Sequence, residues 1–281
     1  MSATPSPSPG LKKPWRTWPG ALSSRPPGSV STLRPSERPW KRPSSNAFQC
    51  PPNLKPPNPG GEGMRLSRGV RVSVLVMLLV AWGLTWWAYP RMPAQMVTHW
   101  GLAGQPNDWM PRLWGTLIGP LTLTILALLY FGLIPAIEPW RENLQRFWEV
   151  YTQTGLALLL FLLLLHGYTI AWNLGYLWDI RRFIGVLMGL LFAALARLLL
   201  HARPNWFIGI RTPWTLSSPW VWQQVHRHGA YALAAIALLW LLGTLWPLLL
   251  TVALAATLLW ALGLIAYSYW LYQRKARAGA P

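Results

Sequence analysis

Residues 203–222 read RPNWFIGIRTPWTLSSPWVW and form the one stretch that the composition of the surrounding chain does not explain. The stretch lies between two long apolar runs, yet it holds four Trp, three Pro and two Arg. Proline restricts the backbone, and Gly209 can adopt conformations that other residues avoid. We therefore predict a connection of defined shape between two membrane-spanning segments.

The composition of the whole chain is typical of a membrane protein. Of its 281 residues, 53% are hydrophobic and 11% are charged, which leaves too few polar side chains to cover a soluble globule of this size. The net charge of +18 suits the flanks of membrane segments in a lipid bilayer better than nucleic acid, so no direct nucleic-acid partner is expected. The single cysteine, Cys50, allows no disulfide within the hydrophobic body.

Six apolar runs follow Met64, and each is close to the ~20 residues that a helix needs to cross a bilayer. Alternating strand patterns are absent from these runs, and a backbone in lipid must pair its own polar groups, so we predict helices. The predicted fold class is all-α, an integral six-helix transmembrane bundle. The predicted spans are Val72–Tyr89, Leu113–Ile134, Gly155–Leu174, Phe183–Leu200, Ala230–Trp246 and Leu248–Trp270.

The chain divides into four predicted parts. Residues 1–63 hold fifteen of the 27 prolines and show no apolar periodicity, which indicates a disordered Pro-rich extension. Alternatively, Met64 is the true start of translation and the extension is an artefact of gene prediction. Residues 64–150 contain the first two helices with a shaped loop, 151–202 a middle helix pair, and 203–281 the quoted stretch, an interfacial helix and the last two helices.

The distribution of Lys and Arg predicts the orientation of the bundle. Eleven of them fall in connections on one side of the predicted membrane and four on the other, not counting Arg197 inside a span. The richer side faces the cytoplasm by the positive-inside rule, so both termini are expected there. The connection around His99 then faces outward, and the connection around Arg211 faces inward.

The outer connection combines turn residues with polar and aromatic side chains, a composition enriched at binding hot spots. The alternative is that its two Trp simply lie at the membrane interface. A zinc site needs three or four ligands, whereas this connection offers only His99 and Asp108, and His226 and His228 are expected in the inner connection. We expect no metal and no cofactor. The candidate residues that face outward are His99, Trp100, Gly104, Asp108 and Trp109.

The inner connection has two predicted parts, a constrained turn and a short helix that enters the fifth span. Ser218 is a good N-cap and Pro219 a good first helical residue, and we expect this short helix to rest on the inner leaflet. Arg211 can hold loop carbonyls, a lipid phosphate or a partner carboxylate, or it can simply extend to the membrane surface. The candidate residues are Asn205, Gly209, Arg211, Thr212, Pro213, Trp214 and Trp222.

Two stretches carry a resemblance to a known family. Gly209–Leu216 closely resembles the Gly-Ile-Arg-Thr-Pro-Trp-Thr-Leu signature of the bacterial immunity family typified by the immunity protein against sporulation-delaying toxin, SdpI. Pro93–Trp109 resembles a loop of the domain of unknown function that usually precedes the signature. This chain has Pro219 and Trp220 where the family commonly has an acidic pair, which puts in doubt any partner contact that such carboxylates make.

The resemblance implies a non-enzymatic, multi-pass protein of the bacterial cytoplasmic membrane that gives immunity to a peptide toxin on the outer side. It also implies a signalling role in which a cytoplasmic repressor is held at the inner side. A small-solute transporter or channel is the alternative, although the predicted spans contain no Asp or Glu, and ion-coupled transport usually needs titratable groups there. An intramembrane enzyme is disfavoured because no nucleophile lies near a base.

The predicted orientation can be tested with topology reporters. Alkaline phosphatase fused after Pro106 should be active, because that position is expected outside the cytoplasm. A fluorescent protein fused after Ser217 or at the C-terminus should fluoresce, because both positions are expected inside. The reverse pattern would refute the assignment.

Overall fold

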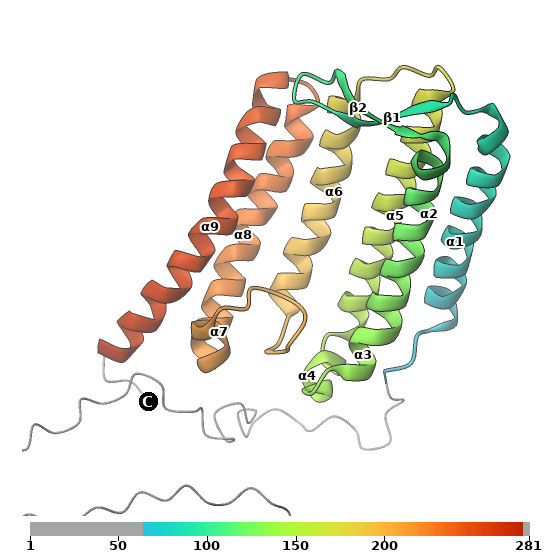
Figure 1. Ribbon diagram of the computed structural model, residues 1–281. Helices are drawn as coiled ribbons and strands as arrows, with labels where there is room; N and C mark the ends of the chain where they lie inside the picture. The colour runs from blue at the N-terminus through green and yellow to red at the C-terminus, as the bar shows by residue number, and fades with distance from the viewer. Residues whose placement is uncertain (1–63, 278–281) are drawn as a thin grey trace, which may run out of the picture. The chain divides into compact units, whose positions relative to one another are not determined.

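The computed structural model describes residues 64–277, so the predicted disordered extension, residues 1–63, lies outside the described residues. The helices and strands follow one another along the chain in the order shown in Figure 1. They are α1 (Arg68–Ala88), a 3₁₀ turn (Tyr89–Arg91), β1 (Gln95–Trp100), β2 (Pro106–Pro111), α2 (Arg112–Ala127), a π-helical segment (Leu128–Leu133), α3 (Ile134–Ile137), α4 (Arg141–Gln145), α5 (Trp148–Asn173), α6 (Ile180–His201), α7 (Pro213–Ser217), α8 (Pro219–Gly243) and α9 (Pro247–Arg277).

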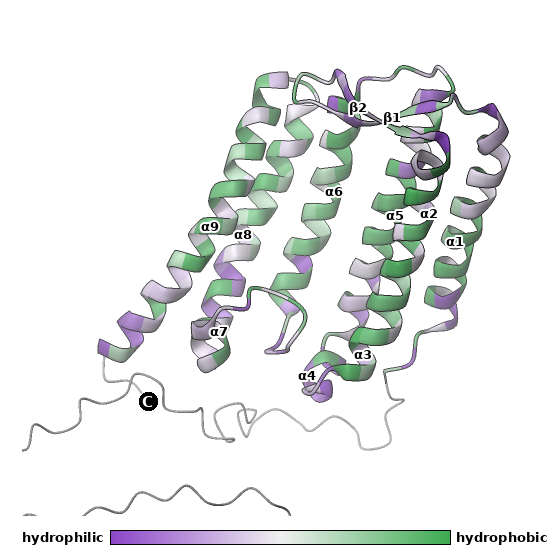
Figure 2. Ribbon diagram, in the orientation of Figure 1, coloured by the Kyte–Doolittle hydropathy of each residue, from purple (hydrophilic) through white to green (hydrophobic). Residues whose placement is uncertain are grey.

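Six of the described helices are long and apolar enough to cross a membrane, which confirms the predicted fold class. The second span combines α2, the π-helical segment and α3, and runs from Arg112 to Ile137. Figure 2 shows hydrophobic residues along the middle of the helices and hydrophilic residues gathered toward their ends. This is the distribution that the hydrocarbon and headgroup layers of a bilayer require. The protein is therefore a multi-pass membrane protein.

The spanning helices form two groups of three. In one group, α1, α2 and α5 pack around a core that includes Ala81, Leu123 and Leu159. In the other, α6, α8 and α9 pack around a core that includes Leu233 and Ala253. The two middle helices, α5 and α6, pack against each other and join the groups. The predicted middle helix pair of residues 151–202 is thus divided between the two groups, with α5 in the first and α6 in the second.

The connection between the first two spans is a β-hairpin, which the sequence analysis did not predict. Its strands pair antiparallel with an irregular register between Val97 and Trp100. The side-chain amide of Asn173, at the end of α5, accepts a hydrogen bond from the Val97 N–H and donates one to the Val97 carbonyl, each at 2.9 Å. Gly104 makes the turn with a φ of 80°. Gly104 is therefore a turn residue as predicted, whereas Pro106, Asn107 and Asp108 lie in β2 and not in a turn.

The fifth span begins earlier than predicted. The Ser218 hydroxyl accepts a hydrogen bond from the Val221 N–H and Pro219 is the first helical residue, as expected. The predicted short helix is not a separate element, because residues 219–243 form the single helix α8. Its first turns bury Trp222 and Val225 against the protein.

The bundle has two ends that differ in structure. The β-hairpin lies at the end where α6 and α9 begin, which we call the hairpin end (Figure 1). Residues 203–218, together with α3, α4 and α7, lie at the opposite end, which we call the loop end. The described chain begins and ends at the loop end. The outer connection, Pro93–Trp109, and the stretch of residues 203–222 thus lie at opposite ends of the bundle.

Gly185 and Gly189 on α6 allow a close contact with α8. A Cβ atom added to Gly189 would lie 2.6 Å from the Leu241 side chain and 3.0 Å from the Ala237 carbonyl oxygen. The backbones of α6 and α8 therefore approach each other more closely here than any side chain at position 189 allows.

Substituting this glycine should separate α6 from α8. Gly189→Ala should lower the midpoint of thermal unfolding in detergent, because overpacking a core typically costs ~1–3 kcal/mol. Gly263→Ala on α9 is the matched control, since nothing lies within 4 Å of a Cβ at that position. An unchanged midpoint in Gly189→Ala would show that the two helices do not meet there.

Candidate functional site

The buried side chain of Asn205 organises the loop end from within. Its amide donates to the carbonyls of Arg203 at 2.8 Å and Ile208 at 2.9 Å. Its oxygen accepts from the backbone N–H groups of Phe207 at 2.9 Å and Ile208 at 2.5 Å. All the usual hydrogen-bonding positions of the amide are used inside one short loop. The candidate Asn205 is therefore a residue that shapes the loop.

Two side chains near α4 attach this loop to the end of the second span. Glu138 is 2% exposed, and its carboxylate accepts from the N–H groups of Trp140, at 2.9 Å, and Trp206, at 3.1 Å. The Asn143 amide donates to the Pro204 carbonyl at 2.8 Å. Sequence reasoning missed both residues, since they lie more than sixty positions before the loop. The sequence held one sign of the role of Glu138, since it is an acidic residue directly after an apolar span.

His226 holds the other side of the loop from α8. Its Nε2 lies 3.0 Å from the backbone nitrogen of Ile210, and its Nδ1 lies 2.8 Å from the Trp222 carbonyl oxygen. A backbone N–H can only donate and a carbonyl can only accept, so the imidazole is neutral with its proton on Nδ1. Gly209, with a φ of 105°, passes so close that an added Cβ would lie 2.4 Å from Nε2. Glycine is needed at position 209 because other residues rarely adopt this positive φ and because a side chain would collide with the imidazole of His226.

The second half of the signature is tied to α9 through hydroxyl groups. Thr212 caps α7, and its side chain and that of Thr215 exchange hydrogen bonds with each other's backbone N–H, with Pro213 as the first helical residue. The Thr212 hydroxyl also lies 3.0 Å from the buried Ser268 hydroxyl on α9. Trp214 packs on Tyr269 with ring centroids 5.0 Å apart. This is a capped, anchored turn.

The two remaining candidates at the loop end differ in exposure. Trp222 is 2% exposed, and its indole N–H donates to the Ala202 carbonyl at 3.0 Å, which fixes α8 to the end of α6. Arg211 is exposed and donates from its guanidinium to the Trp206 carbonyl. Of the alternatives considered for Arg211, the contact with a loop carbonyl is present, and the side chain is exposed at the surface.

At the hairpin end, Trp100 and Trp109 have different environments. The Trp100 ring packs edge-on against Tyr168 and Trp172 of α5, with centroid separations of 5.4 and 5.6 Å. Trp109 is 50% exposed. The exposed His99 shares a 2.7 Å hydrogen bond with the Asn107 side chain. Trp100 thus anchors the hairpin, while His99 and Trp109 stand at its surface.

Asp108 lies opposite His99 in the strand register, but its carboxylate accepts from the neighbouring Trp109 N–H at 2.8 Å. Its side chain is exposed, and the imidazole of His99 pairs with Asn107 instead. In residues 64–277 no group of three or more His, Cys, Asp or Glu could hold a metal ion. Of the outer candidates, His99, Asp108 and Trp109 are exposed on the hairpin, whereas Trp100 packs against α5.

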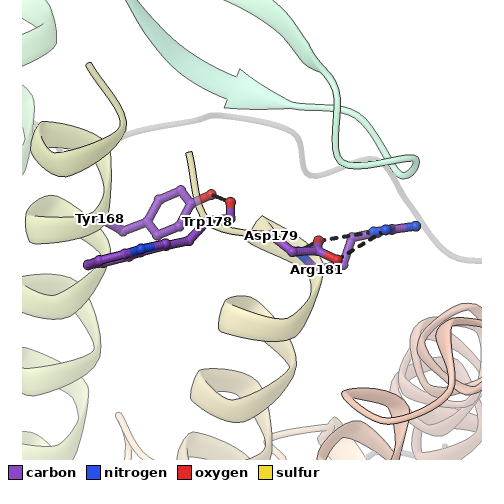
Figure 3. Close-up of polar contacts among 4 residues, drawn as sticks. All are labelled: Tyr168, Trp178, Asp179 and Arg181. Carbon is purple, nitrogen blue, oxygen red and sulfur yellow. Dashed lines mark hydrogen bonds and ion pairs between the residues drawn. The ribbon is translucent and has the colours of Figure 1, made fainter. Parts of the chain in front are cut away.

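An ion pair at the start of α6 supports the hairpin tip (Figure 3). The Arg181 guanidinium donates two hydrogen bonds of 3.1 Å to Asp179, and these bonds hold the pKa of the Asp179 carboxyl below its usual range. An added Cβ on Gly104 would lie 3.3 Å from the Arg181 side chain. In the same connection, the Tyr168 hydroxyl donates to the Trp178 carbonyl at 2.8 Å.

Comparison with known proteins agrees with the resemblance seen in the sequence. Residues 201–268 match the SdpI/YfhL protein family, and residues 76–124 match a domain of unknown function, DUF1648. The first match contains the anchored loop and the second contains the hairpin. The predicted resemblance is confirmed. No curated protein and no solved structure matches the chain.

The contact between His226 and the loop can be tested by substitution. His226→Ala should lower the thermal midpoint, because it leaves the Ile210 N–H without its partner, a loss typically worth ~1–3 kcal/mol. His226→Gln should recover part of the loss, since its carbonyl oxygen can accept from the same N–H. Gln223→Ala is the control, as Gln223 lies three residues away on the same helix and is exposed. Equal midpoints for the Ala and Gln variants would contradict the assigned hydrogen bond.

Proposed function

We propose that this chain protects a bacterial cell against a membrane-active peptide toxin, and that the hairpin end faces outward and receives the toxin. The proposal includes no catalytic step. It is supported most by one observation: the hairpin, within one family-matched segment, and the loop of residues 203–218, within the other, lie at opposite ends of one bundle. A protein that detects a toxin on one side of a membrane and responds on the other needs this arrangement.

The hairpin is suited to the receiving role by its combination of rigid support and exposed groups. Asn173 and Trp100 fix it to α5, while His99, Asp108 and Trp109 are exposed. Binding surfaces of high affinity are commonly built from aromatic and hydrogen-bonding side chains on a preorganised support. The hairpin has this construction without being part of the membrane-embedded core.

The loop end is suited to holding a cytoplasmic partner. The backbone of residues 205–215 is held by buried side chains, and Arg211 and Trp206 are exposed side by side on it. Arginine and tryptophan are the residues most enriched at interface hot spots. We propose that this surface binds a cytoplasmic repressor, and that toxin binding changes its affinity by favouring one of two packings of α5 against α6.

Protection can be measured in a toxin-sensitive bacterium that expresses the full chain. Cells should tolerate a higher concentration of sporulation-delaying toxin than cells with an empty vector. His99→Ala and Trp109→Ala should each lower the half-inhibitory concentration about fivefold or more, as expected for loss of a hot-spot contact. Leu245→Ala, an exposed position at the same end of the bundle, is the control.

Amounts of each variant in the membrane must be matched by immunoblot. Absence of protection by the wild-type chain at a normal membrane level would contradict the proposed function. If both hairpin variants still protect as well as the wild type, the toxin binds elsewhere on the protein and not at the hairpin.

A further inference from the structure

A large cavity lies beneath the hairpin. Its volume is about 830 Å³, and the residues that line it come from the hairpin, α2, α5, α6, α8 and α9. It therefore spans the two three-helix groups at the hairpin end. The volume is in the range of sites that bind small molecules or short segments of chain.

Most of the lining is apolar, but two hydroxyl groups on the helices that line the cavity have no partner. Thr122 on α2 and Thr251 on α9 both line the cavity, and neither hydroxyl makes a hydrogen bond within the described residues. Both are exposed. By contrast, Thr124, two positions along α2, bonds the Pro120 carbonyl at 2.7 Å. Unpaired hydroxyls are costly inside a membrane, so a ligand that pairs with them would be stabilised.

His166 adds a third polar group from α5. It is 4% exposed, and its Nε2 lies 2.9 Å from the Thr85 hydroxyl oxygen. The Thr85 hydroxyl donates to the Ala81 carbonyl at 2.9 Å, so His166 must donate from Nε2. Nδ1 is then an acceptor, and it has no partner among the described residues. The sequence analysis did not place His166 in a site.

These three groups distinguish between two kinds of occupant. They come from three helices, and together they offer two hydroxyls and one imidazole acceptor along an apolar wall. A lipid acyl chain has no donor or acceptor and would leave all of them unpaired. A peptide backbone carries an N–H and a carbonyl on every non-proline residue, and it can pair with groups that are spread over a cavity.

We infer that the cavity binds an apolar segment of the peptide toxin, held by hydrogen bonds from its backbone to Thr122, Thr251 and His166. This inference rests on the proposed function and adds the place where the toxin is held. The hairpin surface makes the first contact, and the cavity beneath it keeps the apolar segment away from the bilayer. The toxin is thereby prevented from inserting elsewhere.

The hydroxyls can be removed without changing the shape of the cavity. Thr122→Val and Thr251→Val should each lower the half-inhibitory concentration of sporulation-delaying toxin about two- to twelvefold, the range for one net hydrogen bond. Thr122→Ser and Thr251→Ser keep the hydroxyl and should stay within about twofold of the wild type. Full-length variants at matched membrane levels are compared in the toxin-sensitive host.

Direct contact is tested by photocrosslinking with the synthetic toxin peptide. A benzophenone amino acid at Ile118, which lines the cavity, should capture the peptide, whereas the same group at Ile125 on α2, outside the lining, should not. If the wild type protects but the Val variants match the Ser variants and Ile118 captures only lipid, the inference is overturned and the proposed function stands. If the wild type does not protect, the proposed function itself fails.

Discussion

The structure depends on one constraint: a partly buried, irregular backbone at the end of a membrane bundle must find hydrogen-bond partners outside regular secondary structure. Residues 205–215 meet this constraint with side chains. Asn205 pairs the loop with itself, Glu138 accepts from it on one side, and His226 accepts from it on the other. An unpaired backbone group in such a place typically costs ~1–3 kcal/mol, so each of these acceptors is needed.

The same contacts join parts of the bundle that are distant in sequence. Glu138 follows the second span, His226 lies on the fifth and Ser268 lies on the sixth, so the loop connects both three-helix groups. The cavity lies at the other end of the bundle, beneath the hairpin, and is lined by residues of both groups. Side-chain hydrogen bonds thus join the two groups at the loop end, whereas a cavity lies between them at the hairpin end.

Much of this architecture could be predicted from the sequence, because apolar runs of spanning length have few alternatives to helices. The cap at Ser218, the turn at Gly104 and the shaped loop at Gly209 follow from local chemistry. The hairpin could not be predicted, since its pairing depends on the amide of Asn173, far along the chain. The role of His226 could not be predicted, because its contact with the Ile210 N–H, sixteen residues earlier, depends on how the loop folds back against α8.

Hydrogen exchange of the full chain in lipid nanodiscs tests the central claim most directly. The claim is that buried side chains protect the backbone amides of residues 205–215 from exchange as strongly as the hydrogen bonds of a helix do. Amides of Phe207, Ile208 and Ile210 should then exchange on the time scale of α8 and far more slowly than the exposed hairpin tip at Leu102–Ala103. Exchange of the loop as rapid as that of the tip would contradict the account.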